Sequence, residues 1–278
     1  MSAPELVALM LADGRLPTGG HTQSAGLEAA VRAGLGANGN HLEHVVEYAR
    51  DRLHTVTRVE AAVAVVTRHV ILAQSAEGPA ASRPASEGAA APSRVKRLAP
   101  GSPSRGLRLG PPDQSSRLDA AGLGQAGAPG WVAVERAWAA RTPSDVLRGV
   151  SRRQGRLLLR LARRVWPGVV EYLPVDGEVP RAIVLGVVAA VNGLPAEQLA
   201  RIVAYEDAQT VVSASLKLLP VDPADAASWL AGLDDDIERL VKDVAPLTEP
   251  NAIPADGAPL IDVFAHQHAT ERMRLFHA

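Results

Sequence analysis

Apolar and polar positions follow one another along most of this chain with the period of an α-helix. Between residues 42 and 73 apolar side chains return every three or four places, which is the spacing of one buried helix face. Similar patterns cover residues 4–12, 23–34, 131–140, 143–166, 179–191, 195–219 and 222–244. No segment carries a competing strand pattern. We therefore predict an all-α fold, a single-domain bundle of about eight to ten helices within residues 1–278.

Proline and glycine indicate where several of these helices begin and end. Pro143 and Pro195 stand at positions typical of a first helical turn, and Gly193 closes the apolar segment 179–191. The segment 42–73 is long enough for one helix or for two helices joined end to end. The segment 222–244 is expected to form one helix.

One long stretch departs from this pattern. Residues 76–130 consist mostly of alanine, glycine, proline and serine with scattered arginines, and they carry no sustained apolar period. A chain of this composition buries too little apolar surface to offset the entropy lost on ordering. We predict a disordered insertion that interrupts the single domain. Its arginines could contact an acidic partner, but a solvated linker explains the composition better.

Composition narrows the possible functions further. Apolar residues make up 47% of the chain and aromatic ones only 3%, so the core is expected to consist of alanine, valine and leucine. The 29 Lys and Arg residues are balanced by 30 Asp and Glu, which argues against attraction to nucleic acid or anionic lipid. There is no cysteine, and the most apolar run, 182–191, is too short to span a bilayer. We expect a cytoplasmic protein.

The loop that begins at Gly14 nearly matches the phosphate-binding pattern GxxxxGK[ST]. That loop requires a lysine, a hydroxyl side chain and a preceding strand, but Gly20 and His21 occupy the two side-chain positions. We expect no nucleotide here. A glycine turn that brings two backbones together is the better interpretation, with Thr22 or Ser24 capping the helix that follows.

Two other groups of residues suggest chemistry. The run DDDIE, from Asp234 through Asp235 to Glu238, resembles one aspartate-rich motif of all-α prenyl-transferring enzymes. Those enzymes require a second acidic cluster, which is not found in the sequence. A solvated run of charges on an exposed helix face is therefore favoured.

Histidines are the other candidates, because no thiolate ligand exists. His41 and His44 have the spacing of one helix face, with Glu47 one turn further on, whereas His266 and His268 would diverge on a helix. Neither pair has a third converging ligand in the sequence pattern. We expect surface or packing histidines, and predict no metal site, no cofactor and no catalytic residue.

Four stretches resemble the urease accessory protein UreF family. LPTGGHTQSAGLEAAV (16–31) is similar to the family's N-terminal motif, and LRGVSRRQGRLLLRLA (147–162) to its arginine-rich central helix. Residues 183–220 resemble its two longest apolar helices, and IDVFAHQHATERMRLF (261–276) resembles its C-terminal ending. Order and spacing agree over most of the chain outside 76–130.

This resemblance implies an all-α, usually dimeric protein without catalysis of its own. Members bridge a second accessory protein, UreD (also called UreH), and the GTPase UreG, and they help to load nickel into apo-urease. Any GTP would then belong to UreG, and the loop 14–20 would be scaffold or interface. The alternative function is a prenyl-transfer enzyme that uses Asp234, Asp235 and Glu238.

The resemblance also nominates partner-binding residues. They are Gly19, Gly20, His21, Ser24, Gly26 and Glu28 in the first motif, Lys217 in the long helix, and His268, Arg274, Leu275 and Phe276 near the end. Leu275 and Phe276 are expected to anchor the tail in a partner groove, with Arg274 hydrogen-bonded at the interface; in the alternative, Phe276 folds onto its own core. Deleting 272–278 is expected to abolish partner binding and to leave the melting temperature nearly unchanged.

Overall fold

The structure, a computed structural model, describes residues 3–76, 129–175 and 177–276. The insertion predicted at 76–130 lies almost entirely outside these residues. The described residues contain eleven α-helices and no strand, and nine of the helices are at least nine residues long. The prediction of an all-α bundle is confirmed.

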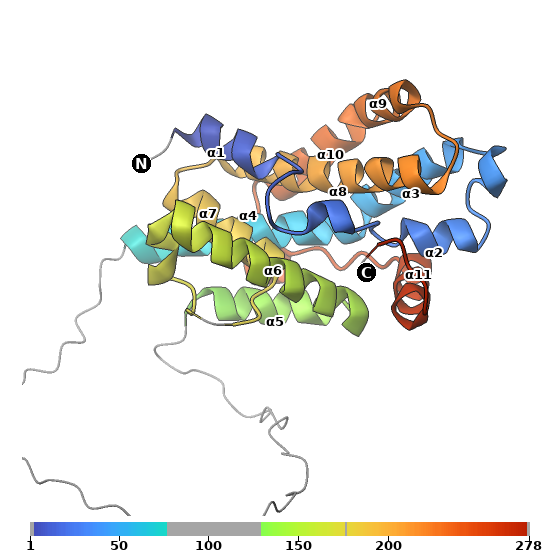
Figure 1. Cartoon of the computed structure of the whole chain (residues 1–278). Helices are drawn as coiled ribbons and strands as arrows, with labels where there is room; N and C mark the ends of the chain where they lie inside the picture. The colour runs from blue at the N-terminus through green and yellow to red at the C-terminus, as the bar shows by residue number, and fades with distance from the viewer. Residues whose placement is uncertain (1–2, 77–128, 176, 277–278) are drawn as a thin grey trace, which may run out of the picture. The chain divides into compact units, whose positions relative to one another are not determined.

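Figure 1 shows the helices in their order along the chain, and most of the connection between α4 and α5 lies outside the described residues. Their bounds are α1 Pro4–Leu11, α2 Leu27–Arg32, α3 Glu43–His54, α4 Val56–Ala76, α5 Trp131–Arg141, α6 Asp145–Val165, α7 Arg181–Val191, α8 Ala196–Leu218, α9 Pro223–Ala231, α10 Asp234–Val244 and α11 Pro259–Thr270. Short 3-10 helices occur at Gly20–Thr22, Ala37–Gly39, Pro167–Glu171 and Pro250–Ala252.

Helix α7 lies at the centre of the core. Every residue of α7 from position 182 to position 190 is buried, because α4, α5, α6 and α8 all pack against it. Gly186 allows α7 to approach α4 closely, since a Cβ at this position would lie 2.5 Å from the carbonyl oxygen of Ala64. The predicted core of small aliphatic side chains is therefore what permits the tight helix packing.

The segment 42–73 resolves into two helices joined end to end. The break is at Thr55, whose backbone has φ −126° and ψ −96°, and whose hydroxyl donates to the carbonyl oxygen of Asp51 at 2.6 Å. Helix α4 then continues to Ala76, slightly beyond the predicted end.

The single helix predicted for 222–244 is wrong, because the chain turns at Gly232 and starts again at Asp234. Leu233, at the turn, is fully buried. The three aspartates from Asp234 to Asp236 then form the first turn of α10, where carboxylates are stabilised by the helix dipole. The acidic run is therefore a helix start that the sequence analysis did not recognise.

The two ends of the predicted insertion lie close together. Gly130, just before α5, lies against Val70 and Gln74 in the last turns of α4, since a Cβ on Gly130 would be within 2.6 Å of either side chain. Within the described residues, none of the helices is both long and apolar enough to cross a lipid bilayer.

Candidate partner-binding site at the chain ends

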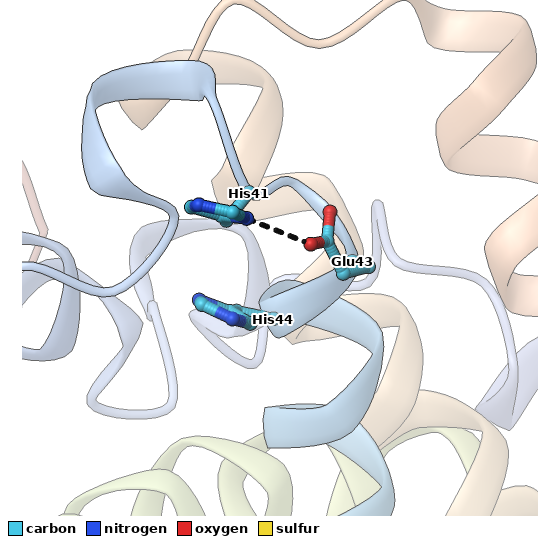
Figure 2. A group of neighbouring side chains, drawn as sticks. All are labelled: His41, Glu43 and His44. Atoms are coloured by element: carbon cyan, nitrogen blue, oxygen red, sulfur yellow. Dashed lines mark hydrogen bonds and ion pairs between the residues drawn. The ribbon is translucent and has the colours of Figure 1, made fainter.

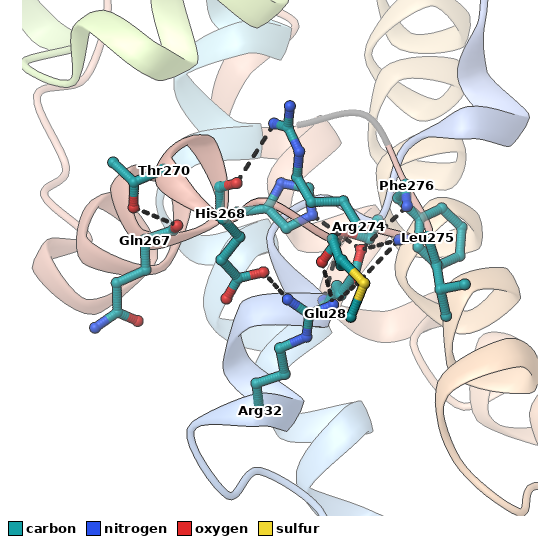
Figure 3. A network of polar contacts seen from close by, with 11 residues as sticks. Glu28, Arg32, Gln267, His268, Thr270, Arg274, Leu275 and Phe276 are labelled. Carbon is teal, nitrogen blue, oxygen red and sulfur yellow. Dashed lines mark hydrogen bonds and ion pairs between the residues drawn. The ribbon is translucent and has the colours of Figure 1, made fainter.

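The first and last motifs of the sequence meet at the carboxylate of Glu28 (Figure 3). The backbone N–H of Leu275 donates to its Oε1 at 2.9 Å, and the N–H of Phe276 donates to its Oε2 at 3.1 Å. The Nε2 atom of His268 lies 2.9 Å from Oε2. Helix α2, helix α11 and the tail that follows α11 are thereby joined at one point.

Arg32 extends this network along α2. Its Nη2 donates to Glu28 at 2.7 Å and to the carbonyl oxygen of Met273 at 2.8 Å, and its Nη1 pairs with Glu271. The spacing of Glu28 and Arg32 is one helical turn, so both face the tail from the same side of α2. The tail is held by its backbone as well as by its side chains.

Burial and hydrogen bonding act in opposite directions on the pKa of Glu28. Glu28 and His268 are each only 1% exposed. Burial alone would raise the pKa of Glu28, but the N–H of Leu275, the ring of His268 and the N–H of Phe276 outweigh it, and the pKa lies below its ordinary value. The carboxylate is therefore ionised at neutral pH and accepts charge-assisted hydrogen bonds.

The two apolar residues of the tail point in different directions. Phe276 is 4% exposed and packs on the chain's own core, and the ammonium of Lys217 lies 5.1 Å from the centre of its ring. Leu275 is 71% exposed. In this conformation Phe276 therefore packs on its own core, which was the alternative considered from the sequence, and it is not available to a partner groove. Leu275 remains accessible.

The backbone conformation at position 26 requires a glycine. Gly26 has φ +82°, and a Cβ at this position would lie 2.8 Å from the hydroxyl oxygen of Tyr48, which itself donates to the carbonyl oxygen of Ala25 at 2.8 Å. Ser24 is buried as well, and its Oγ accepts from the N–H of Glu28 at 3.5 Å. Ser24, Glu28 and His268 were nominated as partner contacts, and in this conformation all three are buried inside the fold.

The loop before α2 has the glycine turn expected from the sequence. Gly19 has φ +80°, and the hydroxyl of Thr22 donates to its carbonyl oxygen at 2.8 Å. Thr22 therefore does not cap α2, whose N-cap residue is Gly26. Gly20 begins the short 3-10 helix, while the side chain of His21 lies outside the described residues. Helix α1, not a strand, precedes the loop, so the architecture of a phosphate-binding loop is missing.

Comparison with known proteins identifies the family. The UreF family model matches residues 113–234. The chain is 32% identical over 270 residues to the urease accessory protein UreF of Mycobacterium sp. (strain JLS), covering 96% of both chains. It is 28% identical over 279 residues to UreF of Mycolicibacterium vanbaalenii, again covering 96% of both. It is 30% identical over 271 residues to UreF of Mycobacterium bovis (strain BCG / Pasteur 1173P2), covering 96% of this chain and 95% of that one.

The chain belongs to the UreF family of urease accessory proteins. Two of the four motifs that carried the resemblance in the sequence, the first and the last, meet around Glu28. Lys217 of α8 joins the same region through its contact with Phe276. Arg274 donates from Nη1 to the carbonyl oxygen of His268 at 3.4 Å. Three segments far apart in the sequence of this UreF-family chain thus form one region.

Beneath the N-terminal loop lies a group of buried charges that the sequence analysis missed. A cavity of about 130 Å³ separates the loop from charged residues on α3, α4, α7 and α8. Arg52 donates to both carboxylate oxygens of Asp207, at 2.9 and 2.7 Å, and Arg181 pairs with Glu206. Burial raises the pKa of Glu206. The adjacent acids Glu206 and Asp207, within a segment predicted to be a largely apolar helix, were the available signal, because buried charges require partners.

Glu60 is the third carboxylate of this buried group. It accepts from the indole Nε1 of Trp138 at 2.7 Å and from the hydroxyl of Ser151 at 3.4 Å, and burial raises its pKa. These contacts tie α4 to α5 and α6 beneath the loop. The group therefore supports the loop from below.

The aspartate-rich run does not form a magnesium site. Glu238 is paired with Arg201, whose Nη2 donates at 2.8 Å. Asp236 is buried and contacts Arg50 at 2.9 Å and His54 at 3.2 Å, so describing the whole run as solvated is wrong. Asp234 and Asp235 are exposed, as expected. Of the three residues in the prenyl-transfer alternative, Glu238 is occupied by Arg201, and among the described residues the run is not part of a group of three or more converging ligand side chains. No observation favours that alternative.

The predicted divergence of His266 and His268 is confirmed. His268 is buried against Glu28, whereas His266 is exposed and its Nδ1 lies 3.8 Å from a carboxylate oxygen of Asp145. The two residues belong to opposite faces of α11. His268 is a packing histidine, as the spacing argument indicated.

Proposed function

We propose that this chain acts as a non-catalytic scaffold in urease maturation, between UreD/UreH and the GTPase UreG, during nickel insertion into apo-urease. Membership of the UreF family supports the accessory role. The observation that carries the proposal is the joining of the N-terminal loop, α11 and the tail at Glu28. A surface assembled from both ends of a chain is suited to recognition, because its geometry exists only in the folded protein.

The face proposed for UreD/UreH is the exposed apolar side of α11 and the tail. It is formed by Leu260, Val263, Met273 and Leu275, of which Met273 is 82% exposed. Exposed apolar side chains of this kind are candidates for burial by a partner. Arg274, which stands between Met273 and Leu275 in the chain and is exposed, would supply a cation for charge-assisted hydrogen bonds.

The face proposed for UreG includes Lys217 on α8 and the loop that contains Gly19 and Gly20. A groove of about 270 Å³ runs between this loop, Lys217 and Phe276. Under this proposal GTP is bound by UreG, and the chain itself requires no cofactor. We further propose that the protein is cytoplasmic and forms a homodimer, for which light scattering would give a mass near twice 29.1 kDa.

Co-purification tests the scaffold role most directly. Replacing both Met273 and Leu275 by aspartate should abolish co-purification with UreD/UreH and urease activation in a host that lacks its own UreF. The matched control is Val170→Asp, which places the same charge at an exposed apolar position on the 3-10 helix after α6. Normal activation by the double variant would refute the proposed face, and normal activation by a host without any UreF would refute the accessory role.

A further inference from the structure

Three side chains with metal-binding atoms converge at the start of α3 (Figure 2). They are His41, Glu43 and His44, and one ligand atom from each lies within 4.8 Å of the other two. His41 and Glu43 are exposed and His44 is half-buried. Among the described residues, no other group of three or more histidine, aspartate or glutamate side chains meets this criterion.

The geometry of the three side chains favours a shared ligand. The rings of His41 and His44 are stacked, with centroids 5.2 Å apart and planes inclined by 16°. The Nδ1 atom of His41 lies 3.0 Å from Oε1 of Glu43. Two atoms bound to one zinc ion at about 2.0–2.1 Å from it lie roughly 3 Å apart. The ligand atoms of the three side chains, now within 4.8 Å of one another, could therefore reach the separation needed to bind one ion by rotation of these side chains at the protein surface.

The backbone fixes the place of these residues before any ligand is bound. His41 comes just before the helix, and its N–H donates to the carbonyl oxygen of Gly36 at 3.2 Å. Gly39 has φ +97° and lies against Pro220, because a Cβ at this position would be 2.7 Å from the proline ring. The turn is thus docked on the segment after α8. Because His41 lies outside the helix, the carboxylate that reaches it is that of Glu43 and not that of Glu47, which helical spacing alone would select.

We propose that His41, Glu43 and His44 form a surface site for one divalent first-row transition-metal ion, with water completing the coordination. Neutral imidazole and carboxylate together suit zinc, nickel, cobalt and copper, whereas magnesium and calcium prefer sites made of oxygen ligands alone. The inference does not depend on the scaffold role proposed above, because it rests only on these three side chains.

Local electrostatics keep the carboxylate of this site charged. The pKa of Glu43 lies below its ordinary value, because its own backbone N–H and the ring of His41 both stabilise the carboxylate. The carboxylate is therefore ionised at neutral pH, but both imidazoles must be unprotonated to bind a metal.

Calorimetric titration of the untagged full-length chain with NiCl₂ or ZnCl₂ tests this site. We expect one ion per chain, no response to MgCl₂, and a loss of affinity of at least about tenfold in His44→Ala and in Glu43→Gln. The matched controls are His69→Ala, an exposed histidine on α4, and Glu47→Gln, the neighbouring exposed carboxylate; both should bind as the wild type does. Equal weakening in the controls, or unchanged binding in His44→Ala, would overturn the proposal.

A second measurement needs no variant. In the wild-type protein, zinc should shift the NMR signals of two histidine rings, those of His41 and His44, and leave the ring of His69 unchanged. Zinc-induced shifts at His69 or at other histidines without shifts at His41 and His44 would place the metal elsewhere and refute the site.

Discussion

The Nε2 atom of His268 lies 2.9 Å from a carboxylate oxygen of Glu28, although 240 residues separate the two in the sequence. Both side chains are almost completely buried, and the same carboxylate accepts the backbone N–H groups of Leu275 and Phe276. The N-terminal motif and the tail are therefore parts of one structural unit. The proposed partner surface depends on this unit for its shape.

Glu28→Gln should destabilise the fold. Glutamine keeps the size of the side chain but removes the charge, and its amide group would face the N–H donors of the tail. We expect a decrease of about 2–4 kcal/mol in the free energy of unfolding, measured by urea denaturation. The matched control, Glu47→Gln on the exposed face of α3, should change that free energy by less than about 0.5 kcal/mol. A Glu28 variant as stable as the control would contradict the role of the buried carboxylate.

The tail should be released in acid. The folded-state pKa of Glu28 lies below its ordinary value of 4.5, so its contribution to stability is complete above that value and is lost as pH falls through the folded-state pKa. At neutral pH the tail remains docked. The NMR amide signals of Leu275 and Phe276 should therefore titrate below about pH 4.5. Persistence of this titration in Glu28→Gln would assign it to another group.

Leu275 and Phe276 should have separable effects. Phe276→Ala removes a buried ring and should cost roughly 3 kcal/mol of unfolding free energy. Leu275→Ala alters an exposed side chain and should leave stability within about 0.5 kcal/mol while weakening co-purification with UreD/UreH. Thermal denaturation and pull-down of the two variants measure both effects. Equal stability of the two variants would show that the ring of Phe276 is not docked.

The docking of the tail on Glu28 changes the expectation for the larger deletion. From the sequence, removal of 272–278 should leave the melting temperature nearly unchanged. Because the tail satisfies the buried carboxylate of Glu28, the deletion should instead lower the melting temperature as well as abolish partner binding. The point variant at Leu275 is therefore the cleaner test of the interface.

Gly186→Ala should destabilise the core. The new methyl group would lie 2.5 Å from the carbonyl oxygen of Ala64 and 2.6 Å from Cβ of Thr67, so α7 must move away from α4. Overpacking of this kind costs about 1–3 kcal/mol, more than the roughly 1 kcal/mol that alanine gains in helix propensity. Denaturant unfolding measures the net loss. Gly257→Ala, at a position with open space around it, should be nearly neutral, and similar losses in both variants would exclude the packing explanation.

Replacing residues 79–128 with a short Gly/Ser linker should leave the fold intact. Gly130 lies against Val70 and Gln74, so the points where the chain leaves α4 and enters α5 are neighbours. Loop closure costs only about 0.6 kcal/mol for each doubling of loop length. Thermal unfolding and co-purification with UreD/UreH should both match the full-length chain. A large loss of either property would show that the replaced segment is structural or a docking element.

The helices were predictable because their burial follows a regular period. The break at Gly232 was missed because the apolar period continues across it, although the aspartates from Asp234 onward match a helix start. The end-to-end junction at Thr55 was anticipated only as an alternative, since no proline or glycine marks it. The spacing of apolar residues in the sequence therefore locates helices well but locates their ends poorly.

The candidate sites depended on contacts that no local pattern contains. The motifs around Glu28 and Leu275 were nominated by family resemblance, but the burial of Phe276 is set by helices distant in sequence. The pairing of Arg52 with Asp207 joins α3 to α8 and has no local signal beyond a charge in an apolar segment. Similarly, Glu43 reaches His41 only because the turn before α3 bends the chain back.

The docking of the tail on Glu28 also has a consequence for the order of folding. The hydrogen bond between Leu275 and Glu28 joins residues 247 positions apart in the sequence. A contact of this kind closes a long stretch of chain, so the entropy of closure is lost before the contact is gained. The helical core can therefore form before the carboxylate of Glu28 receives its two backbone donors from the tail. The surface around the tail is then the last part of the described structure to be completed.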